Sequence, residues 1–414
     1  MKNIIMIALC FISLSGNGQT VKINDILDSI AKNNPSLKGF DVNIRSLEAA
    51  SKGARNWMPP EISTGFWMTP YNIKYWKGSN GNFGIGQYMI SGMQTFPNKK
   101  KQDAEEQYLK SFALPERLNK QYQANALFAE AKTNFYEWII LKKKWAILNE
   151  NEKMFNFMIK DAEIRYKNGL EKISAYYKAQ AALGNIKNLE LITESNINRR
   201  RIILNNLMNH DPASVFEIDS TYNINAEMDA AFDTTALMNQ RSDISAIDRQ
   251  IKINQFQINF ENAKLKPEYG LRYDHMFGFG GLPAQFTLMA TVKLPMARWA
   301  SQSSKANIES IQLKTEAMKL QQKTLVNEAF GQIFNLQNDI ILKREQIKLY
   351  ESKIIPALQK SYQTIQLAYG QNTESLFSLF DAWQTLNMTQ FEYLSLLQEL
   401  LTKKVELEKT IEKK

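Results

Sequence analysis

The chain has 414 residues, a formal net charge of +9 at pH 7 and a pI of about 9.2. This length permits two or three domains. The charge alone would suit nucleic acid, but the basic runs are widely spread and lack the interleaved aromatic residues that single-strand binding needs, so nucleic acid is excluded as a partner. We interpret the runs as solvated helix faces, with lipid head groups as the best specific partner for the first. They are Lys99–Lys101, Lys142–Lys144 and Arg199–Arg201.

Residues 1–18 have the pattern of a secretory signal peptide. Lys2 precedes an apolar run at 4–14, and small residues precede the expected cleavage before Gln19. Cys10 is the only cysteine and follows Leu9, where a lipoprotein signal requires a small residue. We therefore expect a mature chain without disulfide or lipid anchor.

The next elements form one structural half. We expect a helix at about 36–58, a polar loop at 71–81 between two strands, a very long helix at about 98–166 and a return helix at about 170–209. Apolar residues recur at spacings of three and four along the helices, as in helices that pack on neighbours at both sides. Pro115 should kink the long helix without ending it, because the periodicity resumes beyond it. The strands are expected at 61–70 and 83–96.

A polar segment at 209–239, with a short strand candidate at 215–218, precedes a second copy of this half. An offset of 207 relates Pro60 to Pro267, and an offset of 203 relates Tyr166 to Tyr369. A period this long indicates duplication of a whole structural half within one interlocked body. The first repeat covers about 28–210 and the second about 236–408.

In the second half, Tyr269, Leu271 and Tyr273 alternate with polar or small residues, which predicts strands at 268–277 and 285–294. A long helix at about 300–369 follows, kinked at Pro356. In the strand at 83–96, one face should carry Phe83, Ile85, Met89 and Met93.

The four strands suggest a membrane β-barrel portion attached to a mainly α-helical protein. No later stretch has the roughly twenty uninterrupted apolar residues of a membrane helix, so any bilayer crossing must be β-structure. Four strands cannot close a barrel alone, so other copies of the chain must complete it. The alternative is a water-soluble four-stranded patch packed under helices. Available interfacial anchors are Trp67, Tyr71, Trp76 and Tyr88.

Helix lengths add a geometric argument. Nearly seventy residues make a rod of roughly 100 Å, whereas the return helix covers about 60 Å and the helix at 36–58 about 35 Å. Two short helices stacked end to end would therefore span one long helix, with the segment at 209–239 beside the joint. We expect a hollow helical tube continuous with the barrel.

Over essentially the whole mature chain, the sequence resembles the TolC-like outer membrane factors. The resemblance rests on ordered, duplicated motifs. They are Arg165-Tyr166-Lys167-Asn168-Gly169 with Ser174, Ala179, Gln180 and Leu183; Ala368-Tyr369 with Asn372-Thr373, Asp381, Ala382 and Leu386; and Arg241-Ser242-Asp243-Ile244 through Lys264-Leu265-Lys266-Pro267.

The resemblance implies a homotrimer with a twelve-stranded barrel and a periplasmic helical tunnel, in the outer membrane of a Gram-negative bacterium. It implies an exit duct for efflux that works with a periplasmic adaptor protein and an inner-membrane pump. The adaptor would dock on the helical tips, and the tunnel would narrow at Ser378 and Asp381, although Ser378 stands where a carboxylate is often found. The tip residues are Arg165, Tyr166, Gly169, Tyr369, Gly370 and Asn372.

Other functions remain open. A type I secretion duct for polypeptides, a periplasmic adaptor and a structural coiled coil are the alternatives. The sequence shows no zinc motif, cysteine pair or nucleophile elbow, so we expect neither an enzyme nor a cofactor. His210 and His275 lack ligand-spaced partners.

Cargo is expected to be heavy-metal ions or small toxic molecules. The segments 93–100 and 354–358 look somewhat like those of the heavy-metal branch of the family. The sixteen methionines are interpreted mainly as core or lipid-packing residues.

Overall fold

A computed structural model describes residues 20–79, 81–222 and 241–412. The expected signal peptide and most of the polar segment between the repeats lie outside these residues. Within the described chain, no helix combines the length and the hydropathy that a bilayer crossing needs.

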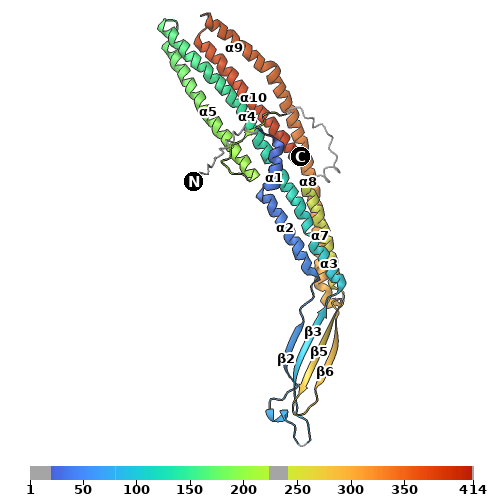
Figure 1. The fold of residues 1–414 in the computed structure, drawn as a ribbon. Coiled ribbons are helices and arrows are strands. Elements are labelled where there is room, and N and C mark those ends of the chain that lie inside the picture. Colours follow the sequence, from blue (N-terminus) through green and yellow to red (C-terminus); the bar gives the residue numbers. More distant parts are fainter. Residues whose placement is uncertain (1–19, 80, 223–240, 413–414) are drawn as a thin grey trace, which may run out of the picture. The chain divides into compact units, whose positions relative to one another are not determined.

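The chain forms two compact units that do not coincide with the two sequence repeats. Of the described residues, one unit, the helical unit, comprises 20–38, 123–222 and 329–412; the other, the sheet unit, comprises 39–79, 81–122 and 241–328. Each unit therefore combines segments from both repeats. The elements are labelled in Figure 1.

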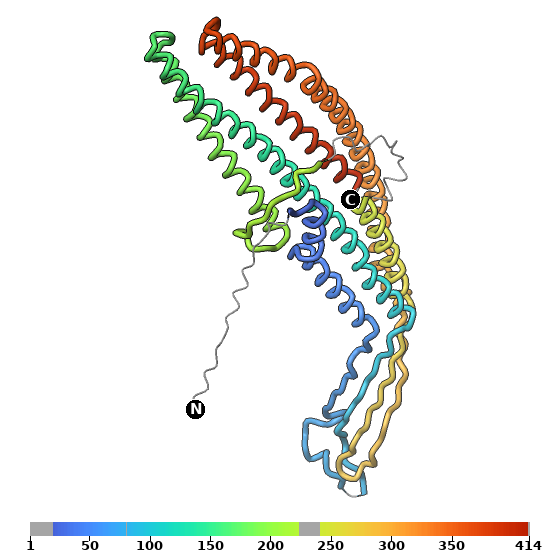
Figure 2. The backbone as a smooth tube through the Cα atoms, turned by 45° about the horizontal axis from the view of Figure 1, so that its top comes forward, coloured from blue at the N-terminus to red at the C-terminus, as the bar shows by residue number. Residues whose placement is uncertain are grey.

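The helical unit consists mainly of two helical hairpins. α5 (Ile173–Met208) returns alongside α4 (Ala113–Lys167), and α10 (Leu376–Thr410) returns alongside α9 (Ile355–Gly370), as Figures 1 and 2 show. α1 (Ile23–Asn33) packs on the C-terminal end of α5, where the Asn34 side-chain amide donates to the Leu207 carbonyl over 2.9 Å.

The segment after α5 lies at this meeting of α1 and α5. β4 (Glu217–Ile218) pairs in parallel with β1 (Thr20–Val21), and Ile218 is buried in a core with Ile26, Trp138 and Leu204. The short strand expected at 215–218 is thus confirmed for its last two residues.

The sheet unit holds one four-stranded antiparallel sheet in the order β2-β3-β5-β6. Two helices of this unit, α7 (Ser242–Lys264) and α3 (Lys99–Ser111), pack on each other. The strands are β2 (Glu61–Trp67), β3 (Gln87–Phe96), β5 (Glu268–Gly278) and β6 (Gln285–Lys293).

Three boundaries differ from expectation. The helix expected to reach residue 58 ends earlier: α2 (Pro35–Ser51) gives way to a 3-10 helix (Lys52–Arg55) and then to extended chain. Pro59 and Pro60 follow, and a proline disfavours helical conformation in the residue before it, here Met58. β3 begins at Gln87, so Phe83 and Ile85 lie in the loop and not on a strand face. The φ of Gly86 is 111°, a value outside the range of extended strand conformation, so the strand begins only after this residue.

The third difference concerns Pro115. The long helix does not merely kink there, because α3 and α4 are separate helices divided at Phe112. A proline ring clashes with the carbonyl four residues earlier, which here belongs to Ser111, the last residue of α3. The second long helix does continue past its proline, as expected: α8 (Arg298–Leu349) joins α9 through a π-helical turn at Tyr350–Ile354, just before Pro356.

The basic runs are only partly solvated. Each contributes one residue to an ion pair within the chain, and these pairs are Lys101–Glu268, Lys142–Glu217 and Arg200–Glu137. These three side chains are paired yet stay partly exposed, so the expected solvated helix faces also carry ion pairs.

Candidate functional site

The two turns at the ends of the hairpins have the same backbone geometry. After α4, Gly169 has a φ of 72° and the Leu170 amide donates to the Arg165 carbonyl over 2.8 Å. After α9, Asn372 has a φ of 61° and the Thr373 amide donates to the Ala368 carbonyl over 3.0 Å. Both turns end a helix with a left-handed residue and a bond spanning five positions, as in a Schellman motif. We call them the first and second tip.

One ionic network connects the two tips. Asp161 Oδ2 accepts from Arg165 Nε over 2.8 Å, along α4, and from the Tyr369 hydroxyl over 2.6 Å, from α9. The Arg165 guanidinium lies 4.2 Å from the centre of the Tyr369 ring and also donates to the Asn372 side chain and, over 3.3 Å, to the Tyr369 carbonyl. Arg165 therefore holds the left-handed residue of the second tip from the first hairpin.

Tyr369 is the buried centre of this network. Only 6% of its surface is exposed. Burial raises the pKa of the phenol, and the hydrogen bond to the Asp161 carboxylate raises this pKa further. The hydroxyl is thus kept protonated as a donor.

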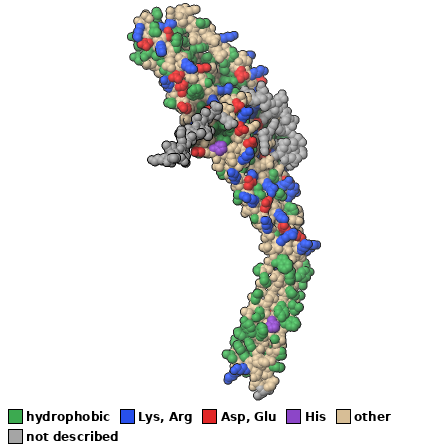
Figure 3. Space-filling model, in the orientation of Figure 1, with side chains coloured by type: hydrophobic (Ala, Val, Ile, Leu, Met, Phe, Trp, Pro, Cys, Tyr) green, Lys and Arg blue, Asp and Glu red, His purple; other side chains and the backbone are tan. Residues whose placement is uncertain are grey.

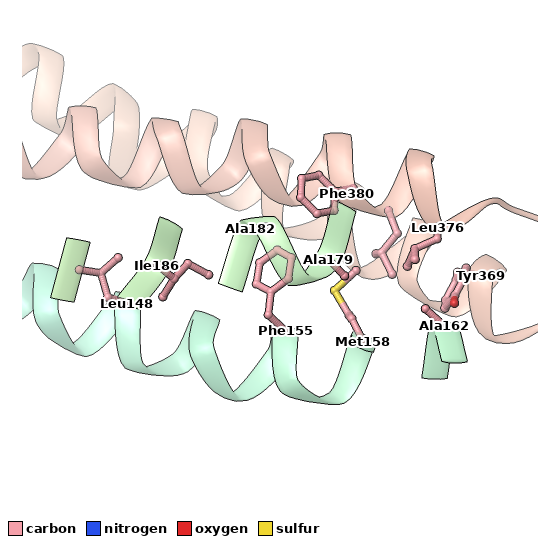
Figure 4. Packing of buried hydrophobic residues seen from close by; sticks show 11 residues of the cluster. Leu148, Phe155, Met158, Ala162, Ala179, Ala182, Ile186, Tyr369, Leu376 and Phe380 are labelled. Carbon is pink, nitrogen blue, oxygen red and sulfur yellow. The ribbon is translucent and has the colours of Figure 1, made fainter. Parts of the chain in front are cut away.

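An apolar core lies beneath the tips and joins all four helices (Figure 4). Phe155 contributes from α4, Ala179 from α5, Tyr369 from α9 and Phe380 from α10. The rings of Phe155 and Phe380 meet edge to face with centroids 5.4 Å apart. The two hairpins are therefore packed together at this end.

The tips also form a groove that sequence analysis missed. It has a volume of about 370 Å³ and lies between the first turns of α5 and α10. The Lys178 ammonium lies 4.0 Å from the ring centre of Phe377, which is 67% exposed, and 4.7 Å from that of Phe380. The available clue in the sequence was Phe377, an apolar residue two positions after Ser375, the residue that caps α10.

The other expected site residues are placed as follows. Tyr166 is half-exposed at the end of α4, and Gly370 is the last residue of α9. Ser378 lies in the first turn of α10, where its amide donates to the Ser375 hydroxyl over 3.2 Å. Asp381 is exposed one turn later on α10. The structure thus brings Arg165, Tyr369 and Asn372 together, whereas Ser378 and Asp381 stand apart from that network.

The sheet unit has two contrasting faces, because successive residues of a strand point to opposite sides. One face, the apolar face, is rich in exposed aromatic and aliphatic side chains. Figure 3 shows apolar side chains covering the strand region with few charged ones among them. Its members include Ile62, Phe66, Ile90, Tyr269, Leu271, Tyr273, Phe277, Phe286, Leu288 and Val292.

The opposite face, the polar face, carries a buried charged cluster. Ser91 and Asp274 are directly opposed on β3 and β5, and both are less than a tenth exposed. Asp274 accepts from the Ser91 hydroxyl and, over 2.8 Å, from Arg272 Nε. The Ser91 hydroxyl also accepts from Arg272 Nε over 3.1 Å, so the three side chains form one connected cluster.

The comparisons with known proteins concern this fold. VceC, an outer membrane protein of Vibrio cholerae, shares 15% identity with a TM-score of 0.72 over 94% of this chain and 95% of VceC. CusC, whose structures describe transmembrane channel formation, shares 13% identity with a TM-score of 0.73 over 94% of this chain and 91% of CusC. The MtrE outer membrane channel of Neisseria gonorrhoeae shares 14% identity with a TM-score of 0.71 over 94% of this chain and 88% of MtrE.

The chain has the fold of the TolC-like outer membrane factors. The resemblance expected from the duplicated motifs is thereby confirmed for the fold of a single chain. No protein-family model and no curated protein matches the chain.

The histidines have ordinary surroundings. His210 Nε2 lies 3.4 Å from the Ser29 hydroxyl, and the His275 ring lies 4.4 Å from the ring of Phe277. Among the described residues, no group of three or more His, Cys, Asp or Glu side chains could hold a metal ion.

Proposed function

We propose that the protein is the outer membrane channel of a tripartite efflux system, in which three copies form a passive exit duct. The observation that carries this proposal is the sheet with one exposed apolar face, one polar face and two open edges. Water-exposed sheets do not usually display an apolar face of this kind. The apolar face would contact lipid, and the polar face would line an aqueous lumen.

Open edges supply the argument for several copies. β2 and β6 are the edge strands, and unpaired backbone groups in hydrocarbon cost several kcal/mol each. Since neighbouring strands alternate in direction along the sheet, β2 and β6 are antiparallel. Identical copies can therefore join edge to edge with the same pairing that operates within each copy. Three copies provide twelve strands, above the minimum of about eight for a membrane barrel.

The tips are the proposed docking surface for a periplasmic adaptor protein. Arg165, Tyr369 and Asn372 fix the shape of the second tip, while Tyr166 and the nearby Phe377 remain exposed to a partner. Gly169 and Gly370 belong to the same surface. Asp381, one turn into α10, is proposed with Ser378 to line the constriction of the helical conduit.

The remaining partners follow from this assignment. The channel would reside in the outer membrane of a Gram-negative bacterium and receive cargo from an inner-membrane pump through the adaptor. Cargo would be heavy-metal ions or small toxic molecules. Support comes from the shared fold with outer membrane channels and from the polar face of the sheet.

Reconstitution tests the channel directly. Protein extracted in mild detergent should migrate as a trimer and conduct ions in planar bilayers. A deletion strain should become sensitive to metals, dyes or detergents and regain tolerance with the intact gene. A monodisperse water-soluble monomer without conductance would overturn the proposal.

A further inference from the structure

A groove of about 300 Å³ lies at the end of the sheet where β3 passes into α3. One wall is formed by the end of the 3-10 helix (Lys52–Arg55) and by Trp57, and the other by the junction of β3 with α3. Gln102 of α3 fastens the two walls, because its side-chain amide donates to the Arg55 carbonyl over 3.1 Å and to the Asn56 carbonyl over 3.3 Å. The groove is therefore formed within the sheet unit before any ligand enters.

The apolar end of the groove continues the apolar face of the sheet. Phe96, the last residue of β3, is opposed to Tyr269 of β5 and so lies on that face. The rings of Trp57 and Phe96 meet edge to face with centroids 5.5 Å apart, and both rings line the groove. Trp57 and Tyr269 are more than half-exposed. An apolar chain lying on the sheet would hence run into the groove without losing apolar contact.

The other end of the groove is polar and basic. Arg55 and Lys99 line it together with Asp103. The Arg55 guanidinium donates to Asp103 over 3.3 Å and, from Nε, to Glu106. Within the part of the chain that the structure describes, these bonds use two of the five N–H groups of a guanidinium, and the exposed Lys99 makes no ion pair. Donors of both cations are thus available to an anion.

Positive charge prevails around the groove. Glu106 also pairs with Lys110, so the groove and its ion pairs hold three basic and two acidic side chains. Nine Lys or Arg residues and two Asp or Glu residues occupy the stretches at this end of the strands, and Figure 3 shows charged side chains giving way to apolar ones where the strands begin. An anionic amphiphile suits this distribution best. The stretches are 52–60, 97–103, 264–268 and 293–299.

We propose that the groove binds an anionic glycerophospholipid, with the phosphate between Lys99 and Arg55 and one acyl chain along the apolar face. Such a lipid has the anionic and the apolar part that the two ends of the groove require. The inference rests on the proposed function, because a sheet inserted in a bilayer would place this groove at the level of the head groups. The bound lipid would fix the depth of the strands in the bilayer.

Lipid retention tests the groove without depending on transport. Detergent-purified, delipidated protein is mixed with phosphatidylglycerol or phosphatidylcholine, and bound lipids are counted by native mass spectrometry. The test variant is Lys99→Gln. Its matched control is Lys100→Gln, because Lys100 is the adjacent exposed lysine and does not line the groove. Trp57→Ala tests the apolar end, with Trp145→Ala in the helical unit as its control.

The expected result is about fivefold weaker binding of phosphatidylglycerol to Lys99→Gln, the effect of one cation near a lipid surface, and little change in Lys100→Gln. Trp57→Ala should weaken the binding of both lipids, and Trp145→Ala should not. The unsubstituted protein should retain phosphatidylglycerol more tightly than phosphatidylcholine.

Three outcomes overturn the inference. Equal losses in the two lysine variants would show a diffuse positive field in place of a site. Equal retention of both lipids would show that the basic side chains select nothing. Displacement of phosphatidylglycerol by inorganic phosphate would assign the groove to a free anion.

Ion conductance separates this inference from the proposed function. Lys99→Gln should conduct potassium like the unsubstituted protein, because Lys99 begins α3 and belongs to neither face of the sheet. Conductance in all forms, with lipid binding indifferent to Lys99, would reject the groove alone. Absent conductance in all forms, with lipid binding still dependent on Lys99 and Trp57, would sink the channel and leave the groove as a site for a membrane surface.

Discussion

The Tyr369 hydroxyl donates a hydrogen bond to Asp161 over 2.6 Å and thereby ties the end of α9 to the end of α4. These residues are 208 positions apart in the chain, and each belongs to a different repeat. The same carboxylate oxygen holds Arg165, which in turn contacts the second tip. The two tips are consequently one connected structure, and changes in one should be felt at the other.

Replacing Tyr369 with phenylalanine should lower the stability of the helical unit by about 1.5–3 kcal/mol, the range for a hydrogen bond to a charged group. Its effect should depend on pH. The unfolded phenol ionises near pH 10, whereas the pKa is raised in the folded state by burial and by Asp161. The stabilisation is therefore complete below about pH 10 and is lost as pH rises above it.

Thermal unfolding in detergent between pH 8 and 11 measures this effect as the difference in Tm between the unsubstituted protein and Tyr369→Phe. Tyr166→Phe is the matched control, since Tyr166 is the equivalent residue of the first tip and is half-exposed. A Tm difference that stays constant across this range would contradict the assigned role of the phenol.

The left-handed residues of the tips support a second prediction. Gly169→Val and Asn372→Val place a β-branched side chain at φ values of 72° and 61°, which costs about 1–3 kcal/mol locally. Both variants should lose export in a complemented deletion strain while still forming trimers, because the deformation is confined to the proposed docking surface.

Two controls accompany these valine variants. Asn372→Gly should export better than Asn372→Val, since glycine adopts positive φ without strain and only the side-chain acceptor of Arg165 is lost. Gly184→Ala lies within α5 where an added methyl group meets open space, and it should be silent. Normal export by both valine variants would count against docking at the tips.

The sequence predicted the parts of this molecule that depend on local pattern. Tyr269, Leu271 and Tyr273 alternate with small or polar neighbours, and β5 follows them closely. Gly169 and Asn372 were predictable as positive-φ residues because few others tolerate that conformation after a helix. The 203-residue offset between them also appears in the structure, as two turns with the same hydrogen bonds.

What the sequence did not predict depends on distant partners. Nothing near Asp161 indicates that it accepts from Tyr369, and nothing near Lys178 indicates that it covers Phe377. Ile85 matched a strand pattern, yet its amide donates to the Tyr75 carbonyl over 2.7 Å in a loop. The pairing of Ser91 with Asp274 depends on the register of β3 with β5, which no local pattern specifies.

The loop end of the sheet supports a third prediction, because glycines allow two loops to meet there. The Gly84 amide donates to the Gly280 carbonyl over 3.0 Å, and the Trp76 ring stacks on Phe279 with centroids 5.0 Å apart. A Cβ atom on Gly84 would overlap the Trp76 carbonyl, and one on Gly280 would overlap the Gly78 amide.

Gly84→Ala and Gly280→Ala should therefore separate the loops and lower the Tm of the trimer, by several degrees if each costs about 1–3 kcal/mol. Gly65→Ala and Gly92→Ala are matched controls, since both lie in the sheet where an added methyl group meets open space. Equal Tm values for all four variants would show that the contact between the loops contributes nothing to stability.

Edge pairing between copies is the most direct consequence of the proposed assembly, and it supports the fourth prediction. Ser63 lies on the polar face of β2, and Gln285, Thr287 and Thr291 lie on the same face of β6. The test combines Ser63→Cys with a cysteine at Gln285, Thr287 or Thr291, one at a time. If β2 of one copy pairs with β6 of the next, one of the three combinations should bring the two Cα atoms within disulfide range, about 4.4–6.8 Å.

Oxidised membranes would then show covalent dimers and trimers, and no larger species, on denaturing gels. The single-cysteine variants are the controls. Cross-linking that extends beyond three copies would replace the closed barrel with an open array, and its absence from every combination would refute pairing between these edges.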